Sequence, residues 1–351
     1  MRHSLPVWVK ALARVMDHHH ACKLDPLYPT VPTCATFSAT RSAKSILSHQ
    51  ERTATEPRDR DLHAATVSKV TSVNDRIKTF RFDLKNKNGF NFLPGQWLDV
   101  FVPGIEKAGG FTITSSPRDA LPQTDIEHTP YFELAVQKSP DNPPAAWLWQ
   151  PDEEIQGKEI NVRIGGSFVW PSPGLDVKKI KRAIFIAGGV GINPMMSMLS
   201  YINQNYPNLE VRILYSTKVP SRETGPGEVL FLPQILDLFR IPRSETTKDR
   251  VELFFTGTWD GSRMETTNEE PIHPLLELTL PKIDLDTEVP VLAWTHRIDE
   301  SALSSAVGKE KEAQQSVYYV CGPPDMTDEI VKFLKEQPNV EENRVFCEKW
   351  W

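Results

Sequence analysis

Residues 183–194, Ala-Ile-Phe-Ile-Ala-Gly-Gly-Val-Gly-Ile-Asn-Pro, constrain this chain more than any other stretch. The apolar run at 183–187 predicts a buried parallel strand. The Gly-Gly-Val-Gly sequence at 188–191 predicts a tight turn in which the main chain can approach a bulky ligand. Asn193 is expected to be a helix N-cap and Pro194 the first helical residue. A strand, a glycine turn and a helix N-terminus in this order are typical of a pyrophosphate-binding site.

The glycine spacing leaves two interpretations open. It reads Gly-Gly-x-Gly-x-x-Pro rather than the Gly-x-Gly-x-x-Gly dinucleotide fingerprint, so a purely structural strand–helix turn is the alternative. As a nucleotide site, the stretch would use the residues Gly188, Gly189, Val190, Gly191, Ile192, Asn193 and Pro194.

Length and charge exclude several classes of protein. A chain of 351 residues is long enough for two domains. Its net charge of −6 argues against nucleic-acid binding. It contains no apolar run long enough to predict a transmembrane segment. The four cysteines are too scattered for a disulfide framework or a metal site, so we predict no metal and a reducing compartment.

The first 60 residues differ from the rest. Up to residue 47 there are six Lys or Arg residues and two acidic ones, and residues 5–16 can form an amphipathic helix. This composition favours a mitochondrial transit peptide, with a secretory signal or a disordered cytoplasmic tail as alternatives. Residues 50–61 are charged and are expected to be a linker. We therefore assign residues 1–60 to a largely disordered targeting segment and linker.

Residues 61–173 carry the signals of short strands. Alternating or apolar runs occur at 64–73, 77–84, 95–102, 131–137 and 160–164, separated by Gly, Asn and Pro residues. Residues 142–149 are expected to be locally helical. This spacing predicts a small antiparallel β-barrel.

Residues 179–351 change to an alternating α/β pattern. Strands are expected at 183–187, 211–215, 251–256, 317–321 and 345–346, with helices from 194, over 229–239 and over 325–335. The polar stretches 257–290 and 304–315 are expected to be surface excursions. The predicted fold class is thus an antiparallel β-barrel followed by a doubly wound parallel-sheet nucleotide-binding domain.

Five motifs make a family resemblance specific. They are Pro94-Gly95-Gln96, Phe111-Thr112-Ile113-Thr114-Ser115-Ser116-Pro117, Gly166-Ser167-Phe168, the glycine turn with Pro194, and Cys321-Gly322-Pro323-Pro324-Asp325-Met326. In this order, from about residue 62 to the end, the chain resembles the ferredoxin–NADP reductase family. The resemblance implies an FAD-binding barrel followed by an NAD(P)-binding domain.

The resemblance also implies roles for individual residues. Phe111 would pack on the isoalloxazine ring, and Thr112 would hydrogen-bond the flavin N5 edge. Cys321 would border the nicotinamide, although a buried structural cysteine is the alternative. A C-terminal acid and aromatic residue would lie over the flavin, or the terminal Trp pair would simply pack at the domain interface. The implied catalytic residues are Thr112 and Cys321, and the further cofactor-binding residues are Phe111, Ser115, Gly322, Pro323, Met326 and Trp351.

The flavin-phosphate end departs from the family pattern. Gly109 stands where the family has an arginine, and Asn142 and Ala145 stand in place of a glycine and a serine. Lys107 or Arg118 are the candidates to replace the missing charge. The loss of two charged or polar contacts predicts weaker flavin binding.

Two functions follow from these residues. The first is a flavin-dependent NAD(P)H oxidoreductase that passes hydride between nicotinamide and flavin, with an unknown electron acceptor. The second is an NAD(H)-binding regulatory or assembly protein that has lost flavin catalysis. Lys218, Arg222 and Glu223 give mixed signals on NAD against NADP, and the choice of FAD or FMN stays open.

Overall fold

A computed structural model describes residues 48–123, 128–218, 228–240, 244, 247–256, 275–277, 291–294 and 296–349. The described residues belong to one compact unit. The predictions that concern residues 1–47, Arg222, Glu223 and Trp351 lie outside the described residues, as does the predicted excursion at 257–290 apart from residues 275–277.

The first half of the described chain forms an antiparallel six-stranded sheet, as predicted. Its strands are β1 (His63–Asn74), β2 (Ile77–Leu84), β3 (Trp97–Phe101), β4 (Gly109–Thr112), β5 (Tyr131–Gln137) and β6 (Glu159–Gly165), in the order β4-β3-β6-β1-β2-β5. An isolated bridge between Ile113 and Leu134 connects the two edge strands. The sheet therefore curls into a barrel.

Alternation along these strands builds the barrel core. Val67 pairs with Phe82, and Phe82 pairs with Phe132, so three neighbouring strands turn apolar side chains to the same face. Leu98 and Phe111 pair across β3 and β4 and belong to the same core. The helices α2 (Pro143–Leu148) and α3 (Asp152–Ile155) follow β5, and the predicted helix at 142–149 is confirmed.

The second half forms a mainly parallel sheet, which confirms the predicted fold class. Its strands are β7 (Arg182–Gly188), β8 (Glu210–Lys218), β9 (Arg250–Thr256), β10 (Leu275–Glu277), β11 (Val291–Trp294), β12 (Ser316–Gly322) and β13 (Val345–Lys349), in the order β10-β11-β9-β8-β7-β12-β13. The edge strand β10 pairs antiparallel with β11, and the other pairings are parallel.

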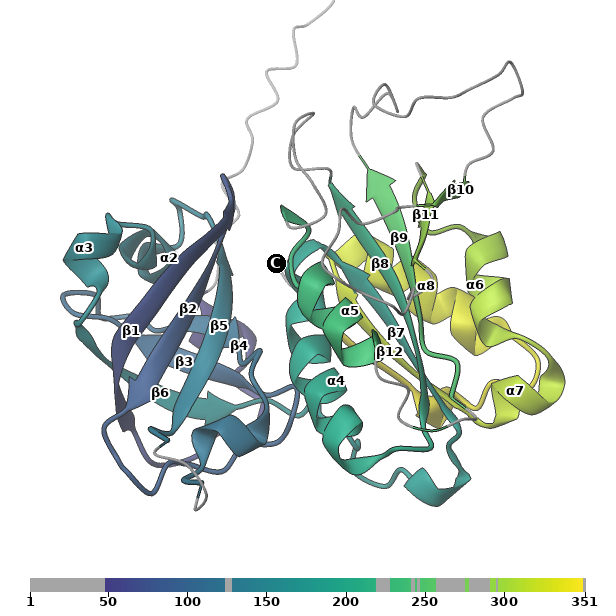
Figure 1. The fold of residues 1–351 in the computed structure, drawn as a ribbon, viewed down its shortest axis with the longest axis horizontal. Coiled ribbons are helices and arrows are strands. Elements are labelled where there is room, and N and C mark those ends of the chain that lie inside the picture. The colour runs from purple at the N-terminus through teal and green to yellow at the C-terminus, as the bar shows by residue number, and fades with distance from the viewer. Residues whose placement is uncertain are drawn as a thin grey trace, which may run out of the picture. The chain divides into compact units, whose positions relative to one another are not determined.

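Helices cover both faces of this sheet (Figure 1). On one face lie α4 (Asn193–Asn205) and α5 (Leu232–Arg240), and on the other lie α6 (Glu300–Val307), α7 (Glu310–Gln314) and α8 (Pro324–Glu336). The central strand β7 is buried along its whole length. Burial on both faces explains why the sequence of this strand is a continuous apolar run.

The expectation of a surface excursion at 304–315 is wrong. Leu303, Ala306 and Val307 of α6 and Ala313 of α7 are buried against the sheet. The polar residues between them cover the outer face of two short helices, so composition alone gave a misleading signal.

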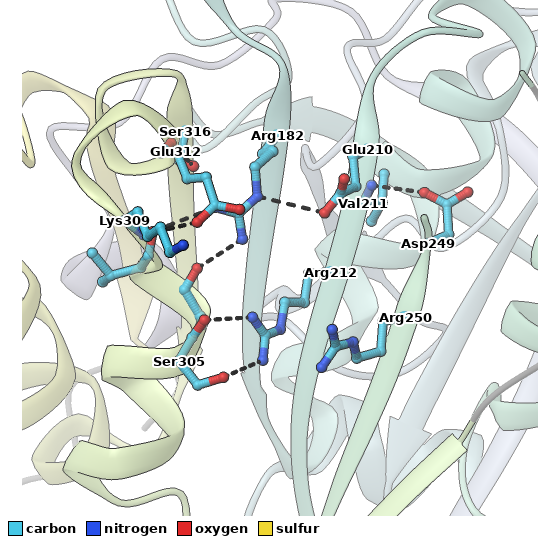
Figure 2. Close-up of polar contacts among 12 residues, drawn as sticks. Arg182, Glu210, Val211, Arg212, Asp249, Arg250, Ser305, Lys309, Glu312 and Ser316 are labelled. Atoms are coloured by element: carbon cyan, nitrogen blue, oxygen red, sulfur yellow. Dashed lines mark hydrogen bonds and ion pairs between the residues drawn. The ribbon is translucent and has the colours of Figure 1, made fainter. Parts of the chain in front are cut away.

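Buried charges fasten α6 to the amino ends of the central strands (Figure 2). The Arg212 guanidinium donates to the Ser305 carbonyl at 2.6 Å and, through Nε, to Glu252 at 2.9 Å. Arg182 donates to the Ala306 carbonyl at 3.0 Å and contacts Glu210 at 3.5 Å. These side chains satisfy the carbonyls at the end of α6, so the cluster is structural.

Residues 50–61 are not the linker that their charge predicted. Helix α1 (His49–Arg52) begins at a Ser48–Glu51 capping box. The His49 ring contacts Asp99 at 3.2 Å, and Arg58 donates to the same carboxylate at 3.0 Å. Because Asp99 is fully buried, these charges are drawn onto the barrel rather than into solvent.

Candidate functional site

The glycine turn after β7 has one open face and one tightly packed face. Gly189 has φ +55°, and no atom lies within 4 Å of the position where its Cβ would stand. A Cβ on Gly191, by contrast, would lie 2.5 Å from the Cys321 carbonyl carbon and 2.9 Å from the Gly322 nitrogen. The first glycine therefore leaves room beside the main chain for a ligand, and the other lets two strand ends pack together.

The helix start differs in detail from the prediction. A short 3₁₀ turn, η3 (Gly189–Ile192), precedes α4, and Asn193 is the first residue of α4 rather than its N-cap. Its side-chain amide instead donates to the Ala135 carbonyl of β5 at 2.9 Å. The expected cap is wrong because this tertiary hydrogen bond takes the side chain away from the helix. Pro194 follows in the first turn, as its fixed φ allows.

The end of β12 lies directly against the glycine turn. A Cβ on Gly188 would stand 2.7 Å from the Met326 sulfur and 2.8 Å from Cδ of Pro323. In register, β12 pairs with β7 up to Cys321 and Ala187. The carboxyl ends of these neighbouring strands thus meet at one edge of the sheet, where ligands bind in open α/β folds.

Strand β4 contributes the residues that resemble a flavin site. The Phe111 side chain is only 8% exposed and packs with the barrel core, so its ring is largely covered. Thr112 is buried, and its hydroxyl oxygen has no hydrogen-bond partner among the described residues. Such an orphaned hydroxyl has unused bonding capacity at the place where the resemblance puts the flavin N5 edge.

One cavity of about 350 Å³ brings these elements together. It is lined by Gly110, Phe111, Thr112, Ala135, Val136, Gln137, Lys138, Ser139, Asn142, Ala145, Gly188, Gly189, Val190, Asn193, Gly322 and Pro323. Residues from the barrel and from the parallel sheet therefore share a single space, and eight of the predicted site residues line it.

The other predicted residues that the structure describes lie behind the lining. The Ser115 hydroxyl accepts from the Glu133 main-chain N–H at 3.0 Å, and Cys321 is fully buried in the core beneath α4. Ile192 is buried in η3 and Pro194 in the first turn of α4, while Gly191 packs against the end of β12 and Met326 against the end of β7. The catalytic role of Cys321 and the cofactor roles of this group stay predictions.

Sequence reasoning missed the contribution of β5 and the loop after it. Residues 135–139 line the cavity, but the sequence predicts only a strand over 131–137 and no site residue in this stretch. The alternation along the strand pointed to this contribution. Leu134 and Val136 belong to the barrel core, whereas Ala135 between them faces the opposite side of the strand and packs with the core of the parallel sheet. Lys138 and Ser139 carry no motif, so the chain had to be folded to reveal them.

A partly buried acid lies beside the end of β12. Glu348 of β13 pairs in register with Cys321, and its Oε2 atom is buried without a hydrogen-bond partner among the described residues. Burial, followed by the nearby charge of Glu56, raises the pKa of Glu348 to about 8. This carboxyl is therefore mostly protonated at neutral pH.

Among the described residues, no helix has the length and apolar character needed to cross a membrane. No group of three or more His, Cys, Asp or Glu side chains in the same part of the chain is arranged to hold a metal ion.

Comparisons with known proteins show which proteins this chain is similar to. No family model matches the chain. Oxidoreductase NAD-binding domain-containing protein 1 of Bos taurus is 31% identical over 328 residues, covering 90% of this chain and 89% of the relative. Its Homo sapiens counterpart is 30% identical over 328 residues, covering 90% and 88%. The propane 2-monooxygenase reductase component of Rhodococcus jostii is 21% identical over 290 residues, covering 81% and 62%.

Solved structures agree in fold. The Amycolatopsis cytochrome P450 reductase GcoB superposes with a TM-score of 0.57 at 17% identity, covering 84% of this chain and 70% of that one. A ferredoxin NADP⁺ reductase from Neisseria gonorrhoeae with bound FAD and NADP gives a TM-score of 0.53 at 15% identity, covering 83% and 99%. The fold is therefore the two-domain fold seen in solved proteins of the ferredoxin–NADP reductase type. Within that class, the chain belongs to the family of oxidoreductase NAD-binding domain-containing protein 1.

Proposed function

We propose that this chain is a flavin-dependent NAD(P)H oxidoreductase that passes hydride between a nicotinamide and a flavin. The observation that carries the proposal is the cavity of about 350 Å³ lined jointly by β4, β5, the glycine turn and the end of β12. Hydride transfer requires the donor ring and the acceptor ring to lie within van der Waals distance. If the barrel holds the flavin and the parallel sheet holds the nicotinamide, the two rings can meet only in a cavity that both halves line.

The sheet side of the cavity fits a nicotinamide dinucleotide. Gly189 leaves an open cradle beside the main chain, where a larger residue would fill the space. Gly322 and Pro323 line the same cavity from the neighbouring strand. Main-chain N–H groups at such a turn can bind a pyrophosphate without any basic side chain.

The barrel side fits the ring of a flavin. Phe111 offers an aromatic edge to the cavity, and the unpartnered Thr112 hydroxyl can donate to a ring nitrogen. When bound, the two cofactors would supply the hydride-transfer chemistry. The residues of this chain would orient the two rings and exclude water, while Glu348 would hold a proton on its carboxyl near the end of β12.

A second function is favoured by one specific observation. The space above Gly109, where the family has an arginine, is filled by the Phe111 ring and Pro144. Ala145 lines the cavity without a hydroxyl. A protein that binds NAD(H) for regulation or assembly, with no flavin, would need neither the arginine nor the serine hydroxyl that the family pattern has at these positions.

The experiment that separates the two functions is spectroscopic. The purified chain is supplied with FAD or FMN, its visible spectrum is recorded, and NADH or NADPH is added anaerobically. Bound flavin that bleaches on addition of the dinucleotide supports the oxidoreductase. Calorimetric binding of NADH by a chain that takes up neither flavin supports the regulatory function, and the absence of both binding events contradicts both.

The electron acceptor and the cellular compartment are separate proposals. Relatives include a monooxygenase reductase component, so we propose a protein electron acceptor that a pull-down with the reduced chain would identify. We propose mitochondrial import directed by residues 1–47. A fluorescent fusion of these residues that stays outside mitochondria would contradict it.

A further inference from the structure

The place of the family arginine is closed in this chain. A Cβ on Gly109 would lie 2.6 Å from the Phe111 ring and 2.7 Å from Cβ of Pro144. A long side chain at this position would have to displace an aromatic ring and a residue of α2. A flavin phosphate on the barrel side therefore finds no arginine at this position, and a basic partner for it has to come from another residue.

Lys138 is the one charged residue among the described residues that line the cavity. Neither Lys107 nor Arg118, the substitutes suggested by the sequence, is part of that lining. The described lining also contains no carboxylate, so no negative charge in it offsets the Lys138 ammonium.

The surroundings of Lys138 keep its ammonium available. Its main-chain N–H donates to the Arg76 carbonyl at 2.8 Å, which fixes the backbone. The ammonium lies 5.4 Å from the centroid of the Trp149 ring. Lys78 lies 5.1 Å from the same ring but is held by Asp152 at 2.6 Å. Lys138 has no ion-pair partner among the described residues.

Ser139 adds a hydroxyl next to this charge. Its carbonyl accepts from the Asn142 N–H at 3.2 Å, which closes a turn between β5 and α2. Ser139 and Asn142 both line the cavity. An ammonium and a hydroxyl on one fixed turn form a phosphate-binding pair.

We propose that Lys138, assisted by Ser139, binds the phosphate ester of the flavin coenzyme in place of the missing arginine. This inference rests on the proposed function, because it takes the flavin as the ligand of the barrel side. A phosphate of the nicotinamide dinucleotide has the same chemistry, so the test must separate the two sources.

The test compares ligands that differ in phosphate. Dissociation constants of FMN, FAD, riboflavin and NADH are measured by fluorescence or calorimetry for the full chain and for Lys138→Ala, Lys138→Arg and Lys78→Ala. We expect Lys138→Ala to weaken FMN and FAD binding about 10-fold and to leave riboflavin and NADH unchanged. Lys138→Arg should restore most of the loss. Lys78→Ala is the matched control, since it removes a cation from the same Trp ring but not from the cavity lining.

Other results would overturn the inference. An unchanged ratio of FMN to riboflavin affinity in Lys138→Ala excludes a phosphate contact. A loss confined to NADH assigns the phosphate to the dinucleotide instead. If the wild-type chain binds NADH but no flavin, the flavin part of the proposed function is wrong, and this inference falls with it. The wild-type measurement alone shows that outcome, so it cannot be confused with an unchanged FMN-to-riboflavin ratio in Lys138→Ala. Melting temperatures check that each variant is folded.

Discussion

The main chain of Gly191 lies against the carbonyl group of Cys321, with 2.5 Å between the carbonyl carbon and the place where a Cβ would stand on Gly191. Because the neighbour is backbone, it cannot rotate away. We expect Gly191→Ala to lower the free energy of unfolding by about 2 kcal/mol, measured by urea denaturation. A variant as stable as the wild type would show that the two strand ends can separate without loss.

Gly189 provides the complementary prediction. No atom lies near its open face, so Gly189→Ala meets only the strain of φ +55°, about 1 kcal/mol. The added methyl group would enter the space assigned to the dinucleotide. We expect NADH affinity to fall at least about 10-fold while the melting temperature changes little. Equal NADH affinity in the variant and the wild type would remove the dinucleotide from this turn.

The buried pair Arg212 and Glu252 should be sensitive to the loss of one partner. Arg212→Leu leaves the Glu252 carboxylate buried without its main counter-charge, and we expect a loss of about 3 kcal/mol in chemical denaturation. Arg250→Leu is the control, because Arg250 is more exposed and lies 3.6 Å from the same carboxylate. The double variant Arg212→Leu with Glu252→Leu should recover part of the loss. No recovery would mean that the hydrogen bonds to Ser305, rather than the uncompensated charge, dominate.

The raised pKa of Glu348 predicts that its contribution to the free energy of unfolding falls as the pH rises. Folding raises its pKa from 4.5 to about 8, first through burial and then through the charge of Glu56. The folded chain thus keeps a proton that the unfolded chain releases, so the contribution is fully present below pH 4.5 and is lost as the pH approaches 8. We expect Glu348→Gln to match the wild type at pH 4.5 and to be about 2 kcal/mol more stable at pH 8. Glu329→Gln, on the exposed side of α8, should show no such divergence.

Asp99 predicts the opposite pH dependence. Burial alone would raise its pKa, but hydrogen bonds from His49, Arg163 and Arg58 outweigh burial and lower the pKa to about 2. Its contribution is present above pH 3.8 and is lost as the pH falls toward 2.

Arg58 tests this arrangement directly. We expect Arg58→Ala to reduce the free energy of unfolding at pH 7 by about 2 kcal/mol, because the fully buried carboxylate then loses one of its two guanidinium partners. Arg60→Ala, an exposed neighbour without an ion pair among the described residues, should be neutral. Equal effects of the two substitutions would show that residues 48–60 do not hold onto the barrel.

The sequence by itself determined the architecture and the glycine turn that follows β7. Continuous apolar runs such as 183–187 are required where a strand is buried on both faces, and the alternation in β1 and β2 follows from a barrel with one buried face. The need for glycine in the turn at 188–191 could be predicted from the sequence. Gly189 adopts φ +55°, which favours a residue without Cβ, and Gly191 packs so close to the Cys321 carbonyl that a Cβ has no room. These constraints act within short stretches of the chain, so they can be recognised in the local sequence.

Only the tertiary structure decided which polar groups meet. Asn193 suits a helix cap by type, yet its amide bonds the Ala135 carbonyl, 58 positions away in the chain. Arg58 belongs to a charged stretch that predicts a linker, yet it and His49 both contact the buried carboxylate of Asp99 in the barrel. Lys138 carries no motif and enters the cavity lining because of where β5 ends. A hydrogen bond or ion pair between distant segments depends on geometry that exists only after the chain has folded, so no spacing along the sequence records it.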